Sequence, residues 1–191
     1  RIKHLGISRR TADGIELRVH PTLIPEKRLI ANVHGVMNAV LVDGNAVGPT
    51  LYYGAGAGAE PTASAVVADI VDVVRDIDLT TGARVPGLGF GQDQLADTPV
   101  LSMDKVETAY YLRMMANEKP GVLAQVTQIL GDRGISIEAI DQKGHDADQV
   151  PVIILTRSVM EGQMNDAITA IEALADISGQ VTRIRVENLD G

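Results

Sequence analysis

Residues 108–142, TAYYLRMMANEKPGVLAQVTQILGDRGISIEAIDQ, decide the fold of the second half of this chain. Residues 109–115 are mostly apolar or aromatic and predict a strand. A helix is expected over 120–132, because apolar residues recur there at helical spacing and Gly134 suits a helix end. Alternating apolar and polar side chains over 135–140 predict a second strand. The stretch therefore forms a strand–helix–strand unit.

The residues that follow complete a small domain. A polar turn is expected at 144–148, a strand at 150–156, a helix at 160–175 and a last strand at 181–186. The order β-α-β-β-α-β is that of the split ferredoxin-like arrangement. Two helices would cover one face of the sheet, so the other face would need a partner sheet or helix. The fold class is α+β.

The first half of the chain predicts an antiparallel meander followed by one packed helix. Residues 15–20 alternate apolar and polar side chains, as in a half-buried strand. Residues 36–42 and 47–53 predict two more strands, joined by the turn sequence Asp-Gly-Asn at 43–45. The short connections favour antiparallel neighbours.

A helix is expected next, over residues 61–77. Its apolar stripe consists of Val66, Val67, Ile70, Val71, Val74 and Ile77. Residues 78–107 then mix glycine and proline with polar side chains and predict a linker. The predicted domains are residues 1–77 and 108–191.

Composition excludes several classes of protein. The net charge is −8, and all of it lies in residues 78–191, whereas residues 1–77 are neutral. An acidic half of this kind argues against a nucleic-acid partner, because phosphate binding needs a basic surface. The chain has no cysteine, which excludes disulfides and thiolate sites and fits a reducing cytoplasm.

Targeting signals are not expected either. No stretch approaches the 18 apolar residues of a membrane span, and no signal-peptide pattern opens the chain. Residue 1 is Arg instead of Met, and Ile2–Ile7 reads as the interior of a structural element. We therefore expect a piece of a longer cytoplasmic protein.

Alternating glycine and alanine at 54–59, just before the predicted helix, form the first candidate site. A helix start offers free N–H groups to an anion, and glycine lets a ligand approach the backbone. The structural alternative is a tight turn with close helix–sheet packing. The run is not a dinucleotide-binding fingerprint, because no β-α-β unit opens here.

Longer stretches around this run resemble a known family, the homoserine dehydrogenases. The resemblance is to the closing half of their catalytic domain, and it lies in Ile2–Ile7, in ELRVHPTLIP at 16–25, in VMNAV at 36–40 and in YGAGAGAEPTASAVVADI at 53–70. It implies NAD(P)-dependent reduction of aspartate semialdehyde to homoserine, in threonine, isoleucine and methionine biosynthesis. It also implies that Gly58 and Thr62 lie near the nicotinamide of NADP or NAD. The family's Rossmann domain, catalytic lysine and substrate-binding acids would lie before Arg1, so we expect no catalytic residue here and no turnover by this chain alone.

The second candidate site is the loop NEKPGVLA at 117–124. A proline and a glycine at a helix start suit a carboxylate, although a well-capped helix would look the same. Residues 108–187 resemble an ACT domain, a module that senses small molecules. The resemblance implies an amino-acid effector at Asn117 and Gly121, with threonine as the expected ligand, and a homo-oligomer formed through the ACT domain. Threonine would then act on the catalytic domain through residues 78–107; the alternative is an ACT domain that only assembles subunits.

The remaining polar residues predict little chemistry. The four histidines, His4, His20, His34 and His145, lack metal-site spacing, and we expect no metal. Asp146 and Asp148 fall in a polar turn, and Ser64 has no histidine and acid at a recognisable spacing.

Overall fold

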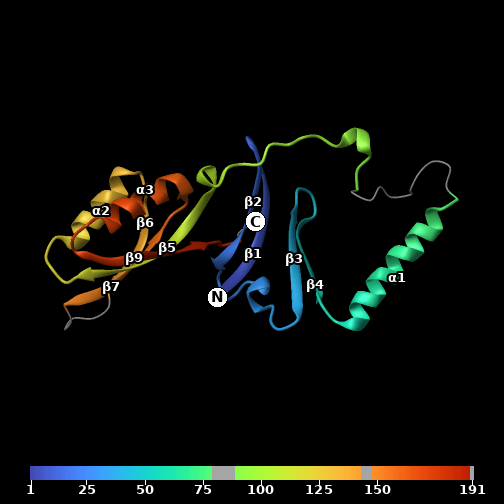
Figure 1. Ribbon diagram of the computed structural model, residues 1–191, viewed down its shortest axis with the longest axis horizontal. Coiled ribbons are helices and arrows are strands. Elements are labelled where there is room, and N and C mark those ends of the chain that lie inside the picture. The colour runs from blue at the N-terminus through green and yellow to red at the C-terminus, as the bar shows by residue number, and fades with distance from the viewer. Residues whose placement is uncertain (79–88, 143–147, 190–191) are drawn as a thin grey trace. The chain divides into compact units, whose positions relative to one another are not determined.

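The computed structural model describes residues 1–78, 89–142 and 148–189. The chain divides into two compact units, and each is described by itself. The first unit combines Arg1–Ala31 with Pro99–Asp190, and the second is Asn32–Thr98. The fold is α+β, as predicted (Figure 1).

The first unit is built on one large sheet. The strand order is β1-β2-β9-β5-β7-β6, with the short β8 pairing with β5. Its strands and helices are β1 (Ile2–Thr11), β2 (Gly14–Leu23), β5 (Glu107–Asn117), α2 (Val122–Asp132), β6 (Ile137–Gln142), β7 (Gln149–Thr156), β8 (Val159–Met160), α3 (Glu161–Glu172) and β9 (Ile177–Val186), with 3-10 turns at Leu29–Asn32 and Met103–Lys105.

The β-α-β-β-α-β order predicted for the second half of the chain is confirmed in β5, α2, β6, β7, α3 and β9. Alternate residues of β5 and β7 are buried beneath α2 and α3, which lie on the same face of the sheet (Figure 1). The core is aliphatic apart from one tyrosine. Its fully buried side chains include Tyr110, Leu112, Leu130, Ile154, Met164 and Ile171. The predicted turn at 144–148 falls almost wholly outside the described residues.

The antiparallel meander predicted for the first half is wrong as a single sheet. Strands β1 and β2 form a hairpin, and β2 then joins β9 in parallel through Thr22↔Arg185 and Leu23↔Val186. The hairpin thus extends the sheet of the ferredoxin-like unit. The next two strands, β3 (Met37–Gly44) and β4 (Gly48–Ala55), form a separate two-stranded sheet in the second unit. Their turn lies at residues 45–47, two residues later than predicted, and each strand begins one residue later and ends two residues later than predicted.

Strand β2 also has the opposite burial from the one its pattern predicted. The residues that point inward are polar, namely Glu16, Arg18, His20 and Thr22, and all four are buried. Leu17 and Val19 point outward and are 49% and 72% exposed. The inward face is polar because those side chains satisfy one another through ion pairs and hydrogen bonds.

The predicted linker at 78–107 ends earlier than expected. Val100 forms a parallel bridge with Ile15, and the Ile15 N–H donates to the Pro99 carbonyl at 2.8 Å. Val106 is almost fully buried, and its carbonyl accepts the Glu161 N–H at 2.8 Å. The chain has therefore rejoined the first unit by residue 99. Residues 79–88 of the predicted linker are outside the described ranges.

The second unit continues from the β3–β4 hairpin into α1 (Ala59–Asp76), with a 3-10 turn at Gln92–Gln94. The apolar stripe predicted for this helix is present, but none of its residues is buried. Val66, Val67 and Ile70 are all more than half exposed. The expectation that the stripe forms core is therefore wrong within this chain.

Candidate functional site: the pocket at the 117–122 loop

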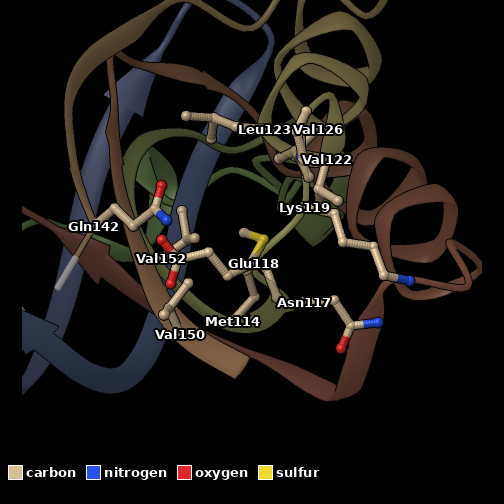
Figure 2. A pocket seen from close by; sticks show the side chains of 12 residues that line it. Met114, Asn117, Glu118, Lys119, Val122, Leu123, Val126, Gln142, Val150 and Val152 are labelled. Atoms are coloured by element: carbon tan, nitrogen blue, oxygen red, sulfur yellow. The ribbon is translucent and has the colours of Figure 1, made fainter. Parts of the chain in front are cut away.

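A pocket of about 300 Å³ lies where β5 ends and α2 begins (Figure 2). Its floor is apolar and comes from the strands and the first turns of α2. Its rim is polar and comes from the connecting loop. The lining residues are Met114, Ala116, Asn117, Glu118, Lys119, Pro120, Val122, Leu123, Val126, Gln142, Val150 and Val152.

The loop is held in place by backbone hydrogen bonds. The Glu118 N–H donates to the Asp148 carbonyl at 3.0 Å, and the Lys119 N–H donates to the Asn117 carbonyl at 2.9 Å. Gly121 precedes α2 with a φ of 94°, a left-handed conformation that favours glycine. No side chain caps the helix. Its first-turn N–H groups are therefore suited to an anionic group.

Asn117 lies at the pocket but its amide is engaged elsewhere. Its Nδ2 donates to Asp176 Oδ1 at 2.9 Å, and its Oδ1 accepts from Gln149 Nε2 at 3.3 Å. Lys119 Nζ also contacts Asp176 Oδ1, at 2.8 Å. The hydrogen bonds from Lys119 and then Asn117 hold the pKa of Asp176 below its usual range. Asn117 therefore ties the loop to the start of β9.

Glu118 is a pocket residue that the sequence reasoning missed. Its side chain extends over the apolar floor in the direction of Gln142, away from Asn117 (Figure 2). The strand periodicity contained the signal: Ala116 faces the core, so Asn117 faces the opposite side and residue 118 turns back. Of the two predicted effector residues, Asn117 lines the pocket, and Gly121 shapes the loop without lining it.

The other predicted site, Gly58 and Thr62, lies at the start of α1 in the second unit. Gly58 immediately precedes the helix with a φ of 128°, and the Thr62 N–H donates to its carbonyl at 3.1 Å. Gly56 packs closely on the β3–β4 hairpin, since a Cβ there would lie 1.9 Å from Asn38 Nδ2. The glycine run thus lies close to Asn38 of the hairpin and ends at the start of α1, but no residue of α1 is buried, so the close helix–sheet packing weighed from the sequence is not seen in the described residues.

A buried cluster of charges lies between β2 and the end of β9, and the sequence reasoning did not identify it. Arg18 has no exposed side-chain surface; its Nε donates to Glu16 Oε1 at 2.5 Å, and its Nη2 pairs with Glu187 Oε1. Arg9 reaches the same two carboxylates from β1, at 3.8 and 3.5 Å. Burial alone lowers the pKa of Arg18, but the hydrogen bonds and charges of Glu187 and Glu16 outweigh it and leave the pKa raised.

A second buried carboxylate, Glu161, begins α3. It accepts from the Tyr110 hydroxyl at 2.9 Å and from Arg185 Nε at 2.8 Å, and it pairs with Arg183 at 3.3 Å. Burial raises the pKa of Glu161, but hydrogen bonds from Arg185 and Tyr110 outweigh it, so the pKa is lowered. Burial and then Glu161 raise the pKa of Tyr110. Glu161 is therefore ionised, and it links α3 to β5 through Tyr110 and to β9 through Arg183 and Arg185.

The histidines and acids that the sequence singled out do not come together. His20 lies beside Arg18, and its Nδ1 forms a hydrogen bond of 3.0 Å with the Thr22 hydroxyl. Among the residues described, no three His, Asp or Glu side chains could hold one metal ion. His145 and Asp146 are outside the described residues. No helix in the described ranges has the length and apolar character needed to cross a membrane.

Comparison with known proteins finds a matching family for each half of the chain. Residues 1–71 match the family model for homoserine dehydrogenase, and residues 110–176 match the model for the ACT domain. A homoserine dehydrogenase from Pseudomonas aeruginosa is 61% identical over 192 residues, which cover 100% of this chain and 44% of that protein. One from Neisseria gonorrhoeae is 53% identical, covering 99% of this chain and 44% of its own length.

A solved structure gives the same result. The crystal structure of a homoserine dehydrogenase from Thiobacillus denitrificans is 63% identical, with a TM-score of 0.92, over 100% of this chain and 43% of that one. The chain thus spans less than half the length of these relatives. By these matches it belongs to the homoserine dehydrogenase family over residues 1–71 and carries an ACT domain over residues 110–176.

Proposed function

We propose that this chain is the C-terminal part of an NAD(P)-dependent homoserine dehydrogenase that senses an amino acid through its ACT domain. The whole reaction reduces aspartate semialdehyde, with hydride transfer from the cofactor to the aldehyde carbon and a proton to its oxygen, and forms homoserine. The product feeds threonine, isoleucine and methionine synthesis. The family matches over both halves of the chain support this assignment. A cytoplasmic enzyme is the corresponding proposal for its location.

The start of α1 is the part of this chain that would meet the cofactor. Gly58 leaves its backbone bare before the helix, and Thr62 places a hydroxyl in the first turn. When bound, the nicotinamide group supplies the hydride. The two residues would position it, since a bare backbone permits close approach and helix N–H groups favour polar or anionic atoms. Nothing in this geometry distinguishes a phosphate on the ribose, so the proposal covers NAD and NADP alike.

The pocket at the 117–122 loop is the observation that carries the sensing proposal. An α-amino acid presents a carboxylate, an ammonium group and a side chain. The first turn of α2 suits the carboxylate, the Glu118 carboxylate suits the ammonium group, and Val122, Val126 and Val152 suit an aliphatic side chain. Threonine, with a methyl group and one hydroxyl, is our proposed ligand.

Titration calorimetry of the chain with L-threonine tests this function, with L-serine, L-lysine and L-methionine as comparisons. We expect saturable heat with threonine, weakened about tenfold or more in Glu118→Gln, because the ammonium group would lose its ionic partner. Asn117→Ala should weaken binding through the loop. Asp166→Asn, an exposed change on α3, should leave the affinity unaltered. Equal heats for all four amino acids, or no effect of Glu118→Gln, would refute this ligand assignment.

The second candidate is an ACT domain that assembles subunits and binds no effector. The sheet face opposite α2 and α3 favours this candidate, because a second subunit could cover the apolar side chains there. Four of them are only partly buried within this chain: Tyr111, Met115, Ile153 and Leu155. Sedimentation of the chain separates the two candidates. An oligomer that forms without threonine and shows no heat on titration supports assembly alone.

A further inference from the structure

One strand connects the effector pocket to the β2 hairpin. Strand β9 begins directly after Asp176, which holds Asn117 and Lys119, and ends directly before Glu187, which holds Arg18. The first anchor lies at the pocket. The second lies in the stretch that carries the homoserine dehydrogenase match. Both anchors are carboxylates bound to cations of other strands or loops.

The central strand β5 pairs with β9 and is hydrogen-bonded to it near both anchors. At one end the Asn117 N–H donates to the Asp176 carbonyl at 2.8 Å. At the other end the Thr108 hydroxyl contacts the Val186 carbonyl at 3.2 Å and Glu187 Oε1 at 3.4 Å. The backbone of the β2 hairpin is bonded to the same point, because the Glu187 N–H donates to the Leu23 carbonyl at 2.9 Å.

Strand β9 also contains an irregularity between its two anchors. Arg113 and Met115 of β5 oppose Thr182 and Ser178, so β9 carries extra residues between these pairs. The Val181 N–H, at this bulge, donates to the Glu172 carboxylate at 2.7 Å. Bulges bend a strand and locally interrupt its pairing, so β9 is less firmly paired with β5 here than elsewhere along its length.

We infer that β9 carries the state of the 117–122 loop to β2, through the Asp176 contacts at one end and the Glu187–Arg18 pair at the other. The inference rests on the proposed sensing function for its ligand, but the mechanical coupling is a property of the chain by itself. This route is separate from the one through residues 78–107 that the sequence suggested. Arg18 and Glu187 are positioning residues in this scheme. Coupling is reciprocal, so each end must respond to a change at the other.

Amide hydrogen exchange, followed by NMR on the 191-residue chain, tests the coupling without any ligand. Glu187→Gln should speed exchange at residues 18–23 by roughly tenfold or more, because Arg18 loses a charged partner within a buried cluster. It should also speed exchange at 117–122, although that loop is at the opposite end of β9. Asp176→Asn should give the reciprocal result at 18–23.

Two controls keep the outcome interpretable. Glu26→Gln, which removes an exposed pair with Arg1 from the same unit, should leave both regions unchanged. The amide of Ile154, a fully buried residue outside the pocket lining, reports global opening and should not change. Faster exchange confined to the substituted end, or equally faster at Ile154, would overturn the inference. Should Glu187→Gln fail to fold, Glu187→Asp keeps the charge but shortens the reach, and the same two regions are compared.

A ligand arm separates this inference from the proposed function. With L-threonine bound, exchange at 18–23 should slow in the unsubstituted chain. In Glu187→Gln the heat of binding should persist while the protection at 18–23 is lost. Protection that survives in this variant contradicts the inference. Absence of any heat contradicts the sensing proposal instead, and the ligand-free comparison then decides the coupling.

Discussion

Replacing Glu161 by glutamine should destabilise the first unit by about 2–4 kcal/mol at pH 7. The side chain is almost fully buried. It accepts hydrogen bonds from the Tyr110 hydroxyl and from Nε and Nη2 of Arg185, and it forms an ion pair with Arg183. Hydrogen bonds to a charged group contribute roughly 1.5–3 kcal/mol each, and breaking a buried pair costs roughly 3–5 kcal/mol. Arg183 and Arg185 keep 27% and 16% exposure, so water offsets part of that loss.

The measurement is urea unfolding at several pH values, monitored through the amide signals of α2. Because the folded-state pKa of Glu161 is lowered, its stabilising contribution is present above its ordinary pKa of 4.5 and is lost as pH falls through the folded value. The difference between Glu161→Gln and the unsubstituted chain should therefore shrink in acid. Tyr110→Phe, which deletes one of the hydrogen bonds, should cost about 1–2 kcal/mol and serves as the control. A Glu161→Gln change below about 0.5 kcal/mol at pH 7, or one that does not depend on pH, would refute the reasoning.

Four further substitutions test other parts of the structure. Leu130→Ala should destabilise the ACT core by about 2–5 kcal/mol because the side chain is fully buried, whereas Val67→Ala on α1, 57% exposed, should cost less than about 0.5 kcal/mol; urea unfolding compares the two. Gly56→Ala should disturb the β3–β4 hairpin, because a Cβ would meet Asn38 at 1.9 Å, and amide shifts confined to the second unit would show it. Burial and then the charge of Arg185 lower the pKa of His20, so the chain should lose stability as pH falls below 6.5, and His20→Gln should reduce that loss; equal pH dependence would contradict the assignment.

The ferredoxin-like half was predictable because each of its elements follows a simple local pattern. In β5 and β7 alternate side chains are apolar and face the helices. Gly121 and Gly134 flank α2 and have left-handed φ values, as expected at helix boundaries. A hairpin turn was predictable for the same reason, since Asp-Gly-Asn at 43–45 has local turn chemistry, although Asp43 and Gly44 extend β3 and the turn falls at residues 45–47. Where local preference and tertiary packing agree, the sequence is sufficient.

The β2 hairpin was mispredicted because its packing is decided far away in the chain. The alternation of Leu17 and Val19 with Glu16 and Arg18 predicts the correct period but not which face is buried. That choice depends on Glu187, which lies 169 residues from Arg18. Glu118 was missed for a smaller reason, since the pocket residues were assigned by resemblance and not by following the strand alternation through Asn117.

The long separation between β2 and β9 has a consequence for synthesis of the chain. At roughly 5–20 residues per second, a ribosome completes β9 on the order of ten seconds after β2. During that interval the inner face of the hairpin has no partner, and a strand with an apolar inner face would be exposed to aggregation. Here that face carries Glu16, Arg18 and His20, which water solvates well. The polar inner face thus adds no apolar surface to that of Leu17 and Val19 on the other face while the hairpin waits for β9.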